Sequence, residues 1–399
     1  MKKLLITAIA VVTLVGGAFT STKEPVKAAD SQVVVFSDIK GHWAEEDIDT
    51  AIRNGYVHGY PDGTFRPNGT ITRAEYAALL SRVTNLKPAS TSDAFPDLKN
   101  HWSREEVNKL VALGFIVPSD YPNGFGPEKE LTRYEMMKWI STGLAKSDPS
   151  FKQALADTKN TLLPTPESFK GGISAEQIPY IALVKGTGII EGFEDGTFRP
   201  SNTTTRAEVT AILLRYAKVE GTWADQYRAL NELREVGKTG TNLTTISNYK
   251  YVVGNFSDIS NTNITLKNNS GVLKLHRFIV VDATSGEQEG VYAPLFVRKL
   301  HDKQKGTYVT FTEMSFVSNL EKSNLLTFSM GLSTGLFSFD RIADKEHVDA
   351  VGIETLPFDS QTYIKKGVEK RFWTTYFLNG SHGAYYLKTD NGKVMQIEN

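Results

Sequence analysis

Three arginines, Arg73, Arg133 and Arg206, stand at the same place in a repeated Thr-Arg-x-Glu sequence. A Thr-x-x-Glu sequence is typical of a capping box, in which the hydroxyl and the carboxylate accept hydrogen bonds from amides at the start of a helix. Each arginine would then occupy the first helical position, where the helix dipole disfavours a cation by roughly 0.3–1 kcal/mol. An anion bound between the helix amides and the guanidinium would offset this cost. The pattern favours ligand-binding arginines, and the alternative is a structural ion pair.

The helices that would position these arginines belong to an internal repeat. The segment 36–43 (FSDIKGHW) recurs at 95–102 (FPDLKNHW), and the segment 59–67 (GYPDGTFRP) recurs at 192–200 (GFEDGTFRP), with a looser copy at 121–127 (YPNGFGP). Apolar residues at helical spacing predict that each copy is a helix, a loop and a second helix. One such unit cannot bury its apolar face alone, so we expect the three copies to pack together.

The combined signature of Phe-x-Asp, His-Trp, Gly-Tyr-x-Asp-Gly-Thr-Phe-x-Pro and Thr-Arg-Ala-Glu resembles the S-layer homology family over about residues 36–217. The resemblance implies an all-α, three-pronged pseudo-trimer of repeats at 36–86, 95–146 and 156–217, the last with a divergent start. It also implies that an exported protein is anchored non-covalently to an acidic secondary cell wall polymer of a Gram-positive bacterium, commonly through pyruvylated N-acetylmannosamine. No cofactor is expected.

Aromatic and acidic residues near the start of the repeats extend the predicted ligand-binding set. Trp43 and Trp102 would stack on a sugar ring or, alternatively, lie in the helical core. Asp38 and Asp97 would accept hydrogen bonds from sugar hydroxyls or cap the adjacent helices. Three turn glycines complete the set: Gly63, Gly124 and Gly196. Two histidines are instead predicted to be structural partners in the turns, with no metal site around them: His42 and His101.

The third copy departs from this pattern. The offset that aligns the arginines of the first and third copies places Glu176 at the position of Trp43. The same offset places Gly171 at the position of Asp38, after an irregular stretch over 156–172. We therefore expect the binding grooves to be unequal.

The N-terminus carries the features of an export signal. Lys2 and Lys3 precede an apolar run over 4–19, which predicts a signal peptide over 1–28. The alternative is an uncleaved membrane anchor, for which the run is short. After cleavage we expect no membrane span. With 45 Lys+Arg and 45 Asp+Glu residues, the chain lacks the excess charge that favours nucleic acid, and without cysteine it forms no disulfide.

The second half is predicted to be rich in strands. A helix over 222–236 and a Gly/Thr-rich linker over 237–245 form a connecting region, 218–248. Alternating apolar runs predict strands over 249–253, 273–281, 308–312, 325–330, 373–378 and 384–387. The expected architecture is a multidomain α plus β protein with an all-β, sandwich-like domain over 249–399.

No catalytic set is evident in this half. The sequence Gly331–Gly335 (GLSTG) matches a nucleophile elbow, but the segment 336–340 predicts a strand where a helix is required. The scattered histidines and the acidic run near Asp344 form no acid–base pair. We therefore predict a non-enzymatic surface protein whose C-terminal module serves self-association in a surface layer or another partner. The alternative is a surface-anchored hydrolase with its site in the C-terminal half.

Overall fold

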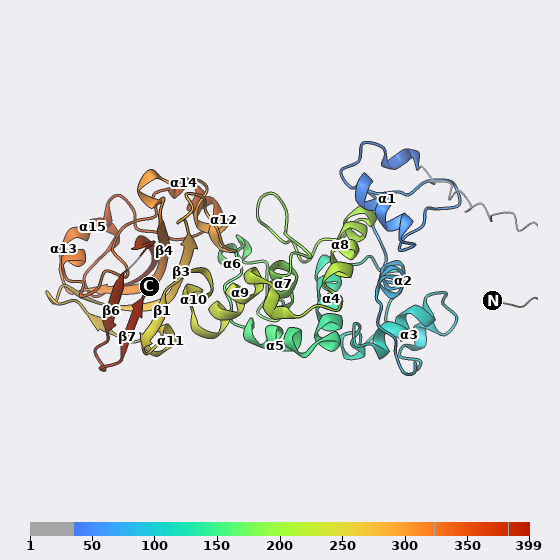
Figure 1. The fold of residues 1–399 in the computed structure, drawn as a ribbon, viewed down its shortest axis with the longest axis horizontal. Coiled ribbons are helices and arrows are strands. Elements are labelled where there is room, and N and C mark those ends of the chain that lie inside the picture. The colour runs from blue at the N-terminus through green and yellow to red at the C-terminus, as the bar shows by residue number, and fades with distance from the viewer. Residues whose placement is uncertain (1–35, 323, 382) are drawn as a thin grey trace, which may run out of the picture.

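The computed structural model describes residues 36–399 apart from 323 and 382, and the predicted signal peptide lies outside these residues. The described chain is elongated, with the repeats at one end and the strands at the other (Figure 1). Over this part of the chain, no helix combines the length and the hydropathy that crossing a bilayer requires.

Each repeat contains the predicted pair of helices. The first repeat consists of η1 (Ser37–Ile39), α1 (Glu45–Arg53) and α2 (Arg73–Val83). The second consists of η2 (Pro96–Leu98), α3 (Arg104–Ala112), η3 (Pro118–Asp120) and α4 (Arg133–Ser147). After an additional helix, α5 (Pro149–Asp157), the third consists of α6 (Glu167–Lys170), α7 (Ile178–Gly186) and α8 (Arg206–Val219). The helix–loop–helix prediction is confirmed.

The second helix of each repeat begins with the predicted capping box. The hydroxyls of Thr72, Thr132 and Thr205 accept a hydrogen bond from the N3 amide, and the N3 glutamate accepts one from the threonine amide. Tyr76 of α2 stacks on Trp139 of α4 with ring centroids 5.3 Å apart, and both side chains are buried. Local sequence thus fixes where these helices begin, and packing between repeats holds them together.

The segment predicted to be a linker is a packed joint instead. The helix α9 (Arg228–Thr239), preceded by η4 (Ala224–Gln226), ends at Gly240 with a φ of 87°, and α10 (Leu243–Ile246) follows. The buried Asn242 donates from Nδ2 to the Val280 carbonyl (2.9 Å) and accepts from the Val280 amide (2.8 Å). The composition of this segment indicated a solvated linker, but the polar side chain of Asn242 is buried and forms its hydrogen bonds with a strand instead of with water.

Two antiparallel sheets form the C-terminal part. One sheet has the order β2 (Ile264–Thr265), β3 (Gly271–Asp282), β4 (Thr307–Ser318) and β5 (Glu369–Asn379), and the other has the order β1 (Lys250–Val253), β7 (Val394–Glu398) and β6 (Ala384–Lys388). Short helical segments lie between the strands: α11 (Phe256–Ile259), α12 (Ala293–Phe296), η5 (Asp302–Gln304), α13 (Leu325–Met330), α14 (Lys345–Val351) and α15 (Ser360–Tyr363). The prediction that the C-terminal part is rich in β-strands is confirmed. It is wrong in describing this part as all-β, because these short helices lie between the strands.

The strand predicted over 325–330 is the helix α13. Asn324 caps it by accepting a hydrogen bond from the Thr327 amide, which an apolar pattern alone does not reveal. Phe328 is buried, whereas Leu326 and Met330 are 66% and 75% exposed. The segment 336–340 is not a strand either.

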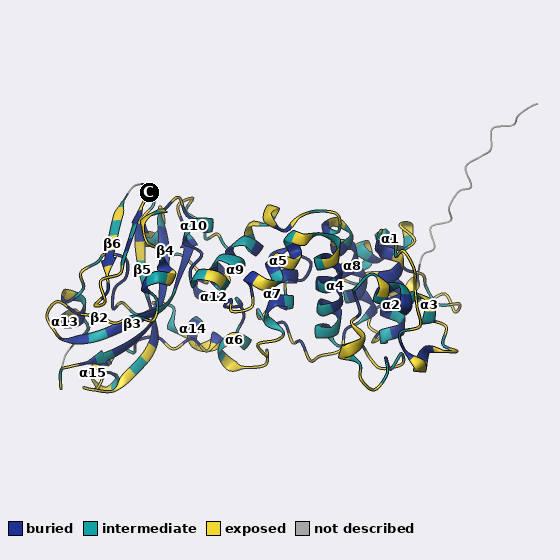
Figure 2. Ribbon diagram, turned by 90° about the horizontal axis from the view of Figure 1, so that it is seen from below, coloured by how far each residue is buried: buried dark blue, intermediate teal, exposed yellow. Residues whose placement is uncertain are grey.

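The central strand β4 is buried on both faces (Figure 2). Its Val309 and Phe311 pack into the hydrophobic core that extends from the repeats, and its Met314 and Phe316 pack into a second core on the other face. Phe169 of the third repeat contacts Trp373 of β5, with ring centroids 6.3 Å apart. The repeats and the sheet are therefore joined by continuous packing.

Candidate ligand groove between the repeats

The three predicted arginines each reach from one repeat into the next. The Nη1 group of Arg73 in the first repeat donates to the Phe125 carbonyl of the second repeat (2.6 Å). Nε of Arg133 in the second repeat donates to the Phe198 carbonyl of the third repeat (2.9 Å). Nε of Arg206 in the third repeat donates to the Phe65 carbonyl of the first (3.0 Å). These contacts form a closed circuit through all three repeats.

The helix amides beside these arginines are part of the same circuit. The amides of Arg73, Arg133 and Arg206 donate to the carbonyls of Lys129 (2.9 Å), Asn202 (2.8 Å) and Gly69 (2.9 Å), respectively. The hypothesis that these amides are free for an anion is therefore wrong. A carbonyl of the neighbouring repeat supplies the negative partner that the helix N-terminus needs.

Two of the guanidiniums also form ion pairs in partly buried surroundings. Arg73 lies 2.6 Å from Glu135, and Arg133 lies 3.1 Å from Glu208. Burial lowers the pKa of Arg133, although Glu208 opposes this effect. Arg206 donates to the His58 carbonyl and has no ion-pair partner among the described side chains. All three arginines thus stabilise contacts between repeats, and a direct contact with ligand remains a proposal.

The two tryptophans lie on the surface. Trp43 is 65% exposed and Trp102 is 58% exposed, so the alternative that they belong to the helical core is wrong. The ring of His42 lies 5.5 Å from that of Trp43, and its Nε2 lies 3.0 Å from Asn68 Oδ1. His101 contacts Ser103 and Glu128 in the equivalent turn, so both histidines are structural partners as predicted.

Asp38 and Asp97 hold the turn of their own repeat, which neither alternative anticipated. The Asp38 carboxylate accepts hydrogen bonds from the amides of Phe65 (3.0 Å) and Arg66 (2.7 Å), and Asp97 accepts equivalent bonds. Burial opposes ionisation of Asp38, but these backbone bonds outweigh it and lower the pKa of the carboxyl. The aspartates are not helix N-caps, because the helices that follow begin at Glu45 and Arg104.

The sequence did not reveal the residue that performs this task in the third repeat. Glu167 of α6 accepts hydrogen bonds from the amides of Phe198 (2.9 Å) and Arg199 (2.7 Å). The fixed offset points to Gly171 instead, because the inserted stretch shifts the register. From the sequence one could have expected that some carboxylate within 156–172 accepts the hydrogen bonds of the turn amides. Only the fold shows that this residue is Glu167.

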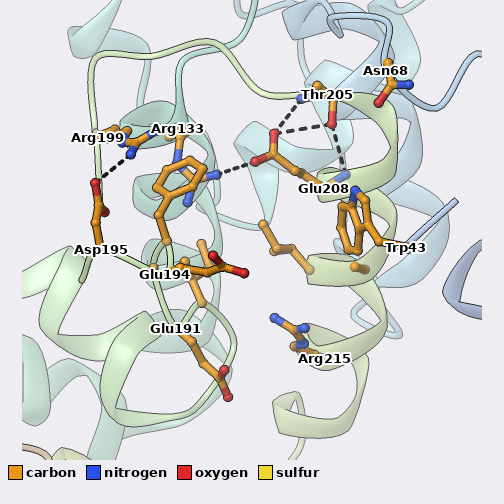
Figure 3. A pocket seen from close by; sticks show the side chains of 15 residues that line it. Trp43, Asn68, Arg133, Glu191, Glu194, Asp195, Arg199, Thr205, Glu208 and Arg215 are labelled. Carbon is orange, nitrogen blue, oxygen red and sulfur yellow. Dashed lines mark hydrogen bonds and ion pairs between the residues drawn. The ribbon is translucent and has the colours of Figure 1, made fainter. Parts of the chain in front are cut away.

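A groove of about 770 Å³ lies where all three repeats meet (Figure 3). The first repeat contributes Trp43, the second contributes Arg133, and the third contributes a loop and one face of α8. The third-repeat lining includes Glu191, Phe193, Glu194, Asp195, Arg199, Glu208 and Arg215. Figure 3 shows Trp43 and Arg215 on one side of the groove, opposite Glu191 and Glu194.

This groove combines the groups that bind a charged sugar. An exposed indole offers a flat apolar face to a sugar ring. The carboxylates of Glu191 and Glu194 can accept hydrogen bonds from hydroxyls, and arginine can pair with an acid substituent. Within the described ranges, no group of three or more His, Asp or Glu side chains is arranged to hold a metal ion.

The acidic run in the C-terminal part is occupied by ion pairs. Arg298 lies 2.9 Å from Asp344 and 3.3 Å from Glu346, and Lys345 pairs with Asp349. The segment after the elbow-like Gly331–Gly335 sequence, residues 336–340, is not helical, so the nucleophile-elbow geometry is not formed.

Comparisons with known proteins match the repeats. The model of the S-layer homology domain matches residues 35–77, 94–137 and 171–210. An S-layer protein of Bacillus licheniformis is 26% identical over 242 residues, which are 59% of this chain and 26% of that protein. A cellulosome-anchoring protein of Acetivibrio thermocellus is 42% identical over 126 residues, 30% of this chain and 28% of its own. An amylopullulanase of Thermoanaerobacterium thermosulfurigenes is 29% identical over 196 residues, 49% of this chain and 10% of its own.

Proposed function

We propose that this chain, which carries three S-layer homology repeats, is attached by them to an acidic secondary polymer of a Gram-positive cell wall. The repeats and the S-layer and anchoring relatives support a secreted, cell-wall-associated surface protein. The chain spans only 10% to 28% of the lengths of the three relatives described above. The polymer and the partners are therefore proposed for this chain from its own groove.

The observation that carries the proposal is the exposed Trp43 in the groove at the meeting point of the repeats. A sugar ring would stack on the indole, and its hydroxyls would donate to Glu191 or Glu194. A pyruvate ketal would direct its carboxylate to an arginine of the groove, since a guanidinium matches a planar carboxylate. This gives a pyruvylated amino sugar as the proposed ligand.

We further propose that the repeats form a three-pronged pseudo-trimer. The closed circuit of arginine and amide contacts supports this arrangement, because every repeat contacts the next through an equivalent arginine side chain and an equivalent backbone amide, which donate to equivalent carbonyls. More than one ligand site on such a body would add avidity, so that modest single-site affinities give durable attachment.

The C-terminal part is proposed to be a non-enzymatic module that takes part in surface-layer assembly. The S-layer relatives favour this function, and the acidic run around Asp344 is already paired with Arg298. The alternative is a wall-anchored hydrolase, which the amylopullulanase and an endo-1,4-beta-xylanase of Thermoanaerobacterium saccharolyticum among the relatives favour.

We expect the double substitution Trp43→Ala and Trp102→Ala to lower co-sedimentation of the protein with purified cell walls by more than tenfold. Each lost stacking contact is worth about 1 kcal/mol, and losing two also removes avidity. Both side chains are more than half exposed, so the melting temperature should not change.

The matched control is Trp223→Ala, because Trp223 is 56% exposed and does not line the groove. Walls stripped of their secondary polymer should retain neither the wild type nor the control. Equal sedimentation of wild type and double variant with polymer-bearing walls would contradict the proposal.

A further inference from the structure

We propose, on the basis of the proposed wall attachment, that an acidic sugar is bound by exposed arginine pairs that only two repeats carry. The pairs are Arg199 with Arg215, beside Trp43, and Arg66 with Arg82, beside Trp102. The third junction, at which α4 of the second repeat meets α7 of the third, lacks both arginines and the tryptophan. We infer that it binds no acidic sugar. The chain therefore has two ligand sites rather than three.

The first evidence is a coordinated difference between the repeats. The second repeat has Gly126 where the others have Arg66 and Arg199, and Thr142 where they have Arg82 and Arg215. At each junction the tryptophan position belongs to the other repeat: Trp43 of the first repeat faces the third, and Trp102 of the second faces the first. At the third junction, between the second and third repeats, this position is Glu176. Three residues that would act on one ligand are thus present together at two junctions and absent together at the remaining one.

The loops and helices place these residues at equivalent locations. Trp43, Arg199 and Arg215 line one groove, in which the start of the first repeat meets α8. The helix α1 packs on α8, α3 packs on α2, and α7 packs on α4, so each junction joins the same two elements. From the packing of α3 on α2 we infer that Trp102 lies beside Arg82, and the packing of α7 on α4 brings Glu176 to α4. At the last of these, Lys138 lies 3.5 Å from Glu176 and 2.9 Å from Asp120.

The backbone conformation at the two loop arginines, Arg66 and Arg199, is unfavourable for any residue that has a side chain. Arg66 and Arg199 have φ values of 59° and 48°, in the left-handed region that favours glycine. The equivalent residue of the second repeat is Gly126, with a φ of 65°. Arginine at a glycine position costs about 1 kcal/mol or more. A cost accepted in two repeats and avoided in the third points to a task for the guanidinium.

Each loop guanidinium is held in place at the surface. Arg199 lies over the Phe193 ring at 4.1 Å, donates from Nη2 to Asp195 (2.7 Å), and has a side chain that is 42% exposed. Arg66 makes equivalent contacts with Tyr60 (4.1 Å) and Asp62 (2.7 Å). These contacts use Nη2 and Nε, so Nη1 remains to donate to a ligand.

The two helix arginines, Arg82 and Arg215, supply the unpaired positive charge that the loop arginines lack, because each loop arginine already forms an ion pair with an aspartate. Because Asp62 and Asp195 neutralise the loop guanidiniums, a carboxylate ligand needs a second cation. Arg82 and Arg215 are exposed, and neither forms an ion pair with any described residue. The buried Arg133 is already bonded to Glu208 and Phe198, so it is less available than Arg215.

The test transfers the residues of the second repeat into the other two. Arg199→Gly with Arg215→Thr, and Arg66→Gly with Arg82→Thr, reproduce Gly126 and Thr142 and relieve the left-handed backbone. Calorimetric titration of the full chain with pyruvylated N-acetylmannosamine should give two sites for the wild type, one for each double variant and none for the quadruple variant. N-acetylmannosamine without the ketal should bind at least tenfold more weakly to the wild type.

The matched control changes the third junction. Asn123→Ala with Thr142→Ala should leave two sites, and all variants should keep the wild-type melting temperature within a few degrees. Three wild-type sites, or an unchanged number of sites in the quadruple variant, would overturn the inference. If the quadruple variant still sediments with polymer-bearing walls, the arginine pairs are wrong and wall attachment stands. If the wild type itself does not sediment with them, the proposed function fails.

Discussion

Replacing Arg133 by alanine should destabilise the repeats by about 3 kcal/mol. The side chain is buried, donates to the Phe198 carbonyl and pairs with Glu208 at 3.1 Å. Its removal leaves a buried carbonyl and a partly buried carboxylate without their partner. It also opens the closed circuit of contacts between the second and third repeats.

One effect acts in the opposite direction but is smaller. Arg133 is the first residue of α4, where the helix dipole disfavours a cation by roughly 0.3–1 kcal/mol. Alanine removes this penalty and also has a high helix propensity. The lost pair and carbonyl bond outweigh these gains, so the net change should still be a clear loss of stability.

Urea unfolding followed by tryptophan fluorescence and circular dichroism measures this change. Arg215→Ala is the matched control, since it removes an exposed arginine from the same groove and should change the free energy of unfolding by less than about 0.5 kcal/mol. The two variants then separate stability from binding: Arg133→Ala should unfold more easily, whereas Arg215→Ala should lose ligand while staying folded. If Arg133→Ala is as stable as the wild type, the arginine does not hold the repeats together.

The start of each second helix was predictable because it depends on adjacent residues. Thr72 and Glu75 are three positions apart, and their hydrogen bonds need nothing beyond the first helical turn. The partner of Arg73 was not predictable in this way. Its guanidinium contacts Phe125 and Glu135, which lie 52 and 62 positions further along the chain, so their approach depends on how whole repeats pack.

The amino-acid composition led to a wrong prediction in the segment 237–245, where polar residues are buried. The Gly/Thr/Asn-rich stretch over 237–245 has the sequence of a flexible linker, yet Thr241, Asn242 and Leu243 are fully buried. The edge of β3 accepts and donates the hydrogen bonds that water would otherwise provide. Only a partner distant in the sequence distinguishes such a joint from a linker.

Replacing Glu232 by glutamine should remove a pH-dependent loss of stability at this joint. Glu232 of α9 is 1% exposed, and its carboxylate accepts hydrogen bonds from Asn242 Nδ2 (3.0 Å) and the Val291 amide (3.3 Å). Burial raises its pKa from 4.5 to about 7, although the Asn242 bond and the nearby Arg228 oppose the increase. The ionised carboxylate is therefore poorly accommodated in the folded protein.

The direction of the pH effect follows from this higher pKa. Below pH 4.5, the carboxyl is protonated in both the folded and the unfolded chain, and its burial carries no ionisation cost. As the pH rises towards 7, the unfolded chain releases the proton first, so the folded protein loses stability relative to it. Above pH 7, the full loss is present, and it amounts to roughly 3 kcal/mol.

The measurement compares the free energy of unfolding of the wild type and Glu232→Gln between pH 4 and pH 8.5. We expect the two proteins to be similar at pH 4, while at pH 8.5 the variant should be more stable by up to about 3 kcal/mol. Glu287→Gln, at an exposed position, should follow the wild type throughout. Parallel curves for the wild type and Glu232→Gln would contradict burial of this carboxylate. A difference that develops between pH 4.5 and 7 would place a titrating group where the repeats join the sheet, so that pH acts on this joint directly.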